Sequence, residues 1–126
     1  MDNFEIKPYL QTPEVRFNAT SGKMLISGKS YPADAIEFYQ PVIAWTKKYV
    51  SEAKQATEVV CDIEYLNSAS QKQLVELFMA FKPLHDEGKG LQVKWKYEEG
   101  DDDIFSVGEL IENELGIPFL YEEMKL

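Results

Sequence analysis

The sequence contains 126 residues with a mass of 14.5 kDa, which fits one domain, residues 1–126, and leaves little room for a second. Its 13 basic and 22 acidic side chains give a formal charge of −9. Such a field repels nucleic-acid phosphates and anionic lipid head groups, so neither nucleic acid nor a membrane surface is expected as a partner.

Cysteine content and hydropathy exclude further classes of protein. The single cysteine, Cys61, excludes an internal disulfide framework and a cysteine-rich metal site. The best apolar run, 77–81, is far shorter than the roughly 20 residues of a membrane-spanning helix. The first residues lack the basic start and the apolar stretch of a secretory signal. We therefore expect a small acidic protein of the cytoplasm.

The first elements expected in chain order are two strands joined by a turn. Residues 1–13 contain Pro8 and Pro13 and predict an irregular lead-in. Apolar and polar residues then alternate over 15–18 and again over 24–28, on either side of a turn that contains Gly22. This pattern is typical of a β-hairpin.

A helix is expected next, opening at 32–34 and running to about Ala53. Its predicted buried face consists of residues at three- and four-residue steps: Ile36, Tyr39, Ile43, Thr46 and Val50. Pro41 lies inside this pattern and predicts a kink or a break, because proline removes one backbone hydrogen bond.

Strands and helices alternate over the rest of the chain. A strand is predicted over 58–65, a helix over 70–85, a strand over 91–97, a helix from 104 to 115 and a short strand over 119–123. In the first of these strands, the residues expected on one side are Val59, Cys61, Ile63 and Tyr65. The order β-β-α-β-α-β-α-β predicts an α/β fold, with helices packed on a mixed, mostly parallel sheet. Alternation within the strand indicates that at least one sheet face is partly solvated.

Few residues are candidates for catalysis. His85, the only histidine, falls in the last turn of a predicted helix, where a cation balances the helix dipole. Cys61 alternates with apolar neighbours, as an inert core thiol would. No phosphate loop, nucleophile elbow or zinc spacing is present. The sequence therefore predicts no catalytic residue, no metal, no cofactor and no enzymatic activity.

The acidic run at 98–103 leaves one alternative open, a small metal-dependent hydrolase. Its spacing differs from that of an EF-hand calcium loop. Asp102 and Asp103 directly precede an apolar helical stripe, and N-capping and the helix dipole explain acidic residues there.

The most informative segment connects the strand at 58–65 to the next helix. Asn67 and Ser68 are expected on the turn, and Ser68 with Gln71 fits a capping box. The same place suits a phosphate, because unpaired N–H groups and the positive end of the helix dipole stabilise an anion, and Lys72 lies one turn further on. A hydroxyl at the carboxyl end of a parallel strand is also accessible to another protein. Ser68 is therefore a candidate for a simple cap and for a phosphorylation site.

Several segments resemble a known family. Residues 30–41, SYPADAIEFYQP, resemble the S-Y-P-x-x-A-x-x-F-Y-x-P signature of the SiaC family of bacterial biofilm-regulation phosphoproteins. Residues 65–70, the strand at 93–97 with its acidic sequel, and the Ile117-Pro118-Phe119 ending are similar to the family as well. The Glu14 strand and Ser27-Gly28 extend the resemblance over nearly the whole chain.

The resemblance implies a STAS-like fold, similar to the anti-sigma-factor antagonists. In that group a cognate Ser/Thr kinase phosphorylates a serine or threonine at the start of the helix after the third strand. A PP2C-type phosphatase reverses the reaction, and the phosphate decides which partner is bound. In the SiaC family the unphosphorylated form is understood to bind and activate a diguanylate cyclase, which implies a role in c-di-GMP signalling and biofilm control.

The family's phosphorylated residue is a threonine within Asn-Thr-Ser-Ser, and Ser68 occupies that position here. Ala69 replaces a serine, so Ser70 is the only close rival. The partner surface should then include Asn67, Ser68, Gln71 and Lys72. The main reading is a non-catalytic phospho-switch that acts on a cyclase or, as in the anti-sigma-factor antagonists, on another output partner. The scarcity of histidine and cysteine disfavours the hydrolase.

Overall fold

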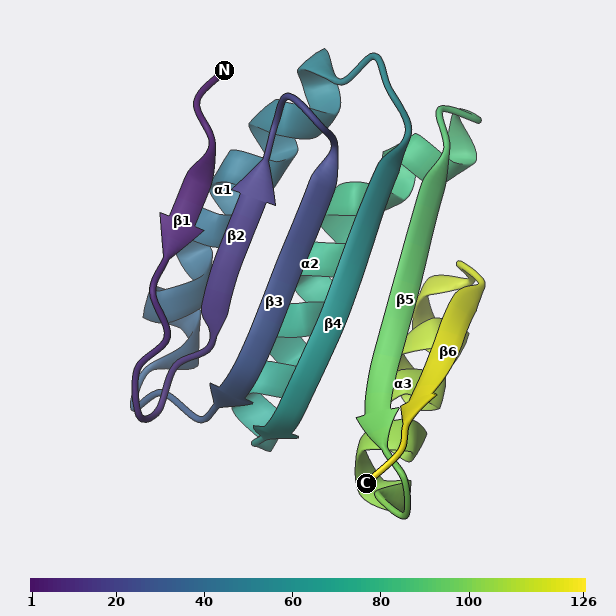
Figure 1. Ribbon diagram of the computed structural model, residues 1–126. Coiled ribbons are helices and arrows are strands. Elements are labelled where there is room, and N and C mark those ends of the chain that lie inside the picture. Colours follow the sequence, from purple (N-terminus) through teal and green to yellow (C-terminus); the bar gives the residue numbers. More distant parts are fainter.

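The computed structural model describes residues 1–126 and contains six strands and three helices. The strands are Phe4–Ile6 (β1), Glu14–Asn18 (β2), Lys23–Ser30 (β3), Thr57–Leu66 (β4), Leu91–Glu98 (β5) and Phe119–Met124 (β6). The helices are Ala35–Glu52 (α1), Ser68–Asp86 (α2) and Asp102–Leu115 (α3). All six strands form one sheet in sequence order, and the helices lie behind it in Figure 1.

The parallel half of the sheet determines where the helices lie. β3, β4, β5 and β6 pair in parallel, and one helix connects each strand to the next. Right-handed crossovers that always step in the same direction place every helix on the same face. The predicted α/β fold with a mostly parallel sheet is therefore confirmed, as is the antiparallel hairpin of β2 and β3. The β3–α1, β4–α2 and β5–α3 connections begin together at one edge, the lower edge in Figure 1.

The irregular lead-in expected over 1–13 was wrong for its first part. β1 pairs antiparallel with β2, with Ile6 opposite Val15, and both Pro8 and Pro13 lie in the loop between the strands. Tertiary contacts hold this three-residue strand, since the Phe4 ring packs near Trp45 of α1, with 6.3 Å between ring centroids. A strand this short has too few positions to show alternation in sequence.

The expected break at Pro41 is also absent, because α1 continues from Ala35 to Glu52. The buried residues on both sides of Pro41 hold the helix against the sheet at the cost of one backbone bond. Ile36 is 67% exposed, contrary to the predicted face, because Ala35 takes the core position at the start of the helix.

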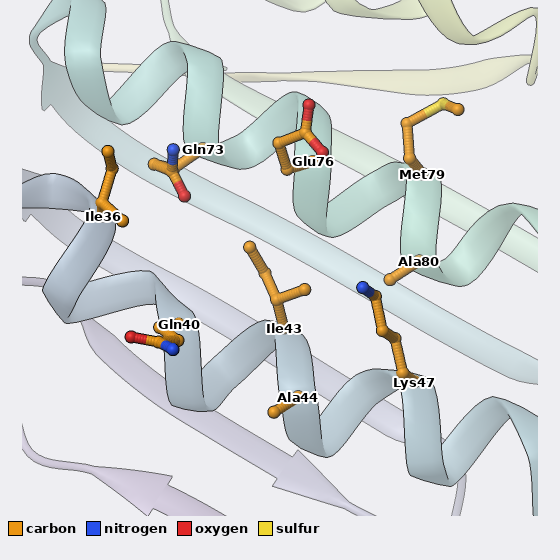
Figure 2. Close-up of a pocket in the computed structure, with 9 residues that line it drawn as sticks. All are labelled: Ile36, Gln40, Ile43, Ala44, Lys47, Gln73, Glu76, Met79 and Ala80. Carbon is orange, nitrogen blue, oxygen red and sulfur yellow. The ribbon is translucent and has the colours of Figure 1, made fainter.

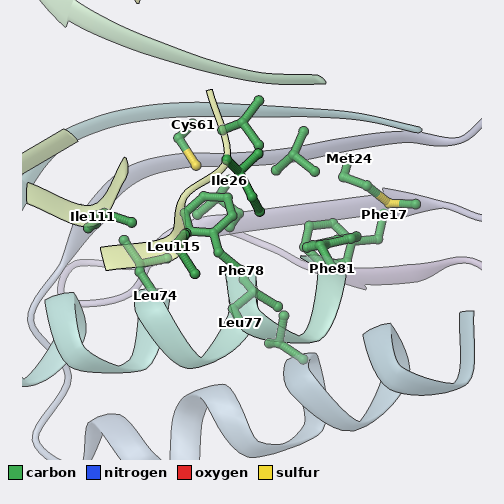
Figure 3. Packing of buried hydrophobic residues seen from close by; sticks show 14 of the residues in the cluster. Phe17, Met24, Ile26, Cys61, Leu74, Leu77, Phe78, Phe81, Ile111 and Leu115 are labelled. Carbon is green, nitrogen blue, oxygen red and sulfur yellow. The ribbon is translucent and has the colours of Figure 1, made fainter. Parts of the chain in front are cut away.

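The core lies between the sheet and the helices. A cluster of 24 buried hydrophobic residues fills this space, and Figure 3 shows α2 contributing Leu74, Leu77, Phe78 and Phe81 to it. Phe81 meets Phe17 of β2 edge to face, with 5.9 Å between ring centroids. α2 therefore runs over the middle of the sheet.

The opposite face of the sheet has no helices over it. Buried and half-buried residues alternate along β4 from Thr57 to Ile63, which confirms the partly solvated sheet face. No helix of this structure has both the length and the apolar character to cross a membrane.

Candidate functional site

The β4–α2 turn lies at the carboxyl edge of the sheet, with Asn67 as the helix cap. Its backbone is extended, at φ −86° and ψ 172°, and its side-chain Oδ1 accepts a hydrogen bond of 2.9 Å from the Ser70 N–H. The expected capping box of Ser68 and Gln71 was therefore wrong. Asparagine caps helices as well as serine does, and α2 begins at Ser68 rather than at residue 70 as predicted.

Ser68 is consequently the first residue of α2, and it is exposed. None of the side-chain hydrogen bonds in this region involves its hydroxyl, since Asn67 provides the cap. The first turn of the helix is closed by a hydrogen bond from the Gln71 N–H to the Asn67 carbonyl. The N–H groups of Ser68 and Ala69 come before this bond and have no carbonyl partner within the helix. A hydroxyl beside free backbone donors is a position where a phosphate can be held.

Ser70 lies only two residues further but in the opposite environment. Its side chain is completely buried, and its Oγ accepts a hydrogen bond of 2.8 Å from the Ser30 Oγ. A kinase cannot reach this hydroxyl in the folded protein. The structure thus separates the two candidate serines by their accessibility.

Two tyrosines lie beside the turn. Tyr31, just after β3, meets Tyr65 edge to face with 5.8 Å between ring centroids. Tyr65 is 52% exposed, although alternation placed it on the core side. A bulge explains the difference, because Gly28 pairs with Ile63 but Lys29 pairs with Tyr65, which leaves Glu64 as an extra residue.

A groove between α1 and α2 extends away from the same turn (Figure 2). It encloses about 640 Å³ and is lined by Ile36, Gln40, Ile43, Ala44, Lys47, Gln73, Glu76, Met79 and Ala80. In Figure 2, Ile43 points from α1 toward α2, and Lys47 reaches toward Ala80. Lys72 and Glu76 follow Ser68 at successive four-residue steps, so one stripe of α2 connects the turn to the groove. Sequence reasoning did not find this groove, since it needs the two helices side by side.

Comparison with protein families gives a match over almost the whole chain. A family model described as "SiaC family regulatory phosphoprotein" matches residues 6–124. The chain belongs to the SiaC family. The resemblance read from residues 30–41 and 65–70 is therefore confirmed.

Similar proteins support the same fold for a SiaC family member. An uncharacterized protein of Pseudomonas aeruginosa (strain UCBPP-PA14) is 22% identical over 119 residues, which are 94% of each chain. The structure of SiaC of Pseudomonas aeruginosa matches with a TM-score of 0.89 and 21% identity, over 98% of this chain and 100% of that one. SiaC in a crystal structure as activator of the diguanylate cyclase SiaD matches with a TM-score of 0.88 and 21% identity, over 96% and 99% of the two chains.

The remaining candidates have structural explanations in this SiaC family member. Cys61 is fully buried, and burial raises the pKa of its thiol far above the usual range. His85 lies in the last turn of α2. Asp101, rather than Asp102 or Asp103, caps α3, with its Oδ1 accepting from the Ile104 N–H at 3.1 Å. Asp102 and Asp103 occupy the first helical turn, where the dipole favours them.

Proposed function

We propose that this protein is a non-catalytic regulator switched by phosphorylation of Ser68, and that its unphosphorylated form binds and activates a diguanylate cyclase. The contrast between an exposed Ser68 and a buried Ser70 carries the proposal. Membership of a regulatory phosphoprotein family supports a phosphorylated residue in this chain. Likeness to SiaC, crystallised as the activator of the cyclase SiaD, supports a cyclase as the partner.

A phosphate on Ser68 leaves the fold intact in this proposal. It adds roughly −1.5 to −2 charge at the position where the helix dipole favours an anion. The exposed Lys72, one turn further along α2, supplies a cation that takes part in none of the protein's ion pairs. The phosphate therefore acts on binding rather than on folding.

The cyclase binds over the turn and the adjoining groove. The surface includes Asn67, Ser68, Gln71 and Lys72, and it continues to the groove, where Lys47 and Glu76 form no ion pair within the protein. Because a charge that loses its hydration in a contact is costly unless it is paired, these two charges favour a cyclase surface with opposite charges facing them. A phosphate covered by the cyclase loses hydration and gains no additional cation from the cyclase, which lowers affinity.

The phosphate is added by a cognate Ser/Thr protein kinase and removed by a PP2C-type phosphatase. We place this cycle in the cytoplasm, where it adjusts c-di-GMP synthesis and thereby biofilm formation. The protein itself requires no cofactor or metal.

The test combines the purified protein with Ser/Thr kinases, PP2C-type phosphatases and diguanylate cyclases from the same genome. Mass spectrometry should locate the phosphate on Ser68, and the unphosphorylated protein should stimulate c-di-GMP synthesis by one cyclase. Phosphorylation should remove that stimulation, and the phosphatase should restore it. A cyclase stimulated equally by both forms would contradict the switch.

A further inference from the structure

Three buried hydroxyl groups connect α1, β3 and the first turn of α2. Tyr39, Ser30 and Ser70 are each completely buried. The Tyr39 hydroxyl lies 2.7 Å from the Ser30 Oγ, which lies 2.8 Å from the Ser70 Oγ. The chain of contacts thus joins residues that are 9 and 40 positions apart in sequence.

The direction of these hydrogen bonds follows from counting protons. The Ser30 hydroxyl donates its one proton to Ser70. Tyr39 must therefore donate to Ser30, which makes the order Tyr39 to Ser30 to Ser70. Burial raises the pKa of Tyr39 to about 12, so its hydroxyl keeps its proton at neutral pH. None of these three side chains is exposed to solvent, so losing a hydrogen-bond partner is costly.

Ser30 holds the turn in two places. Its hydroxyl contacts Ser70, and its backbone carbonyl accepts a hydrogen bond of 3.1 Å from the Asn67 N–H. Ser70 in turn donates its own N–H to the Asn67 side chain. The residues on either side of Ser68 and Ala69 are therefore both fixed to Ser30.

We propose that Tyr39 and Ser30 are positioning residues of the switch, which hold the first turn of α2 so that Ser68 is presented to the kinase in one conformation. This inference rests on the proposed phosphorylation of Ser68. Neither residue touches the phosphate or the partner, and each acts through Ser70 and Asn67.

α1 contains a matched control. Tyr49 is also buried, and its hydroxyl lies 2.7 Å from the Thr57 Oγ1. Tyr49 lies ten positions after Tyr39 in the same helix, and Thr57 is the first residue of β4, at the opposite edge of the sheet. Tyr39→Phe and Tyr49→Phe each remove one buried hydroxyl that contacts the hydroxyl of a strand residue, and Tyr49 is additionally contacted by the Gln55 side chain at 3.5 Å. Only the Tyr39 hydroxyl is connected through Ser30 to the first turn of α2.

The experiment measures hydrogen exchange at three amides: that of Asn67, which donates to the Ser30 carbonyl, and those of Ser70 and Gln71, which donate to the side chain and the carbonyl of Asn67. Loss of a buried hydrogen bond should make these amides exchange about fivefold faster in Tyr39→Phe. Tyr49→Phe should leave them unchanged. The rate of Ser68 phosphorylation by the kinase should fall several-fold in Tyr39→Phe and stay at the wild-type value in Tyr49→Phe.

A second variant tests the order of the contacts. Ser30→Ala should accelerate the same three amides, and adding Tyr39→Phe to it should give no further acceleration, because Tyr39 acts only through Ser30. Equal exchange in the two tyrosine variants, additive effects in the double variant, or faster exchange with unchanged phosphorylation would each overturn the proposal. Absence of phosphorylation in the wild-type protein would instead refute the proposed function, and the exchange comparison would still decide the positioning role.

Discussion

The side-chain oxygen of Asn67 accepts the backbone N–H of Ser70 at 2.9 Å, so the residue before Ser68 caps α2. Asn67 and Ser68 therefore have different roles. Asn67 stabilises the helix, and the Ser68 hydroxyl remains available for modification. The two residues should therefore respond differently to mutation.

Replacing Ser68 by Ala should abolish phosphorylation and change the free energy of unfolding by less than about 0.5 kcal/mol, as for a surface substitution. Replacing Asn67 by Ala should cost about 1 kcal/mol, because the cap is lost. Phosphopeptide mapping and urea denaturation measure the two effects. Persistent labelling of Ser68→Ala would move the acceptor elsewhere.

Ser68→Asp should weaken binding of the cyclase tenfold or more, whereas Ser68→Ala should bind normally. A carboxylate covered by the cyclase loses its hydration without gaining a cation from the cyclase, and each 1.4 kcal/mol or so is a factor of ten in affinity. Calorimetric titration of both variants gives the comparison. The genuinely phosphorylated protein serves as the reference for how well Asp mimics phosphate, and unchanged affinity of that protein would refute the mechanism.

Met79→Glu should prevent cyclase binding, while Leu110→Glu should not. Met79 lines the groove and is 49% exposed, and Leu110 on α3 is 50% exposed and lies outside it. The two substitutions therefore introduce the same charge at equally exposed apolar positions. Titration against the cyclase, with circular dichroism to check folding, distinguishes them; equal loss of affinity would exclude the groove as the specific surface.

Alkaline pH should reduce the contribution of the buried Tyr39 hydroxyl to the stability of the protein. Burial raises its pKa to about 12, against about 10 in the unfolded chain. Folding favours the neutral form of the hydroxyl and thereby adds to the free energy of unfolding. This added stability is complete below about pH 10 and is lost as the pH rises toward 12. Urea denaturation should show the stability of the wild type relative to Tyr39→Phe falling by about 2 kcal/mol between pH 9 and 11.5. A constant difference would contradict the raised pKa.

Regular patterns in the sequence predicted most of the fold. Helical spacing located α2, and alternation located β4 and β5, because one face of each element meets the core along most of its length. The predicted order lacked only β1, which depends on Trp45 of α1 rather than on its own three residues.

The candidate site was predicted less completely. The sequence pattern placed Ser68 on the turn that leads into α2 but named Ser68 as the cap, whereas Asn67 caps the helix and Ser68 is its first residue. The bulge at Glu64 reversed the direction of Tyr65, and nothing in a single sequence marks such an insertion. The buried contact between Ser30 and Ser70 spans 40 residues, so it became visible only with the fold.

The burial of Cys61 makes it possible to attach a fluorophore at one chosen position of the folded protein. It is the only cysteine and is completely buried, so thiol reagents should react with the native protein only when it unfolds. A cysteine introduced at Gln92, exposed on the strand β5, would then be the single labelling site on the folded protein. A fluorophore attached there would report complex formation by anisotropy while the helical side of the molecule stays unmodified.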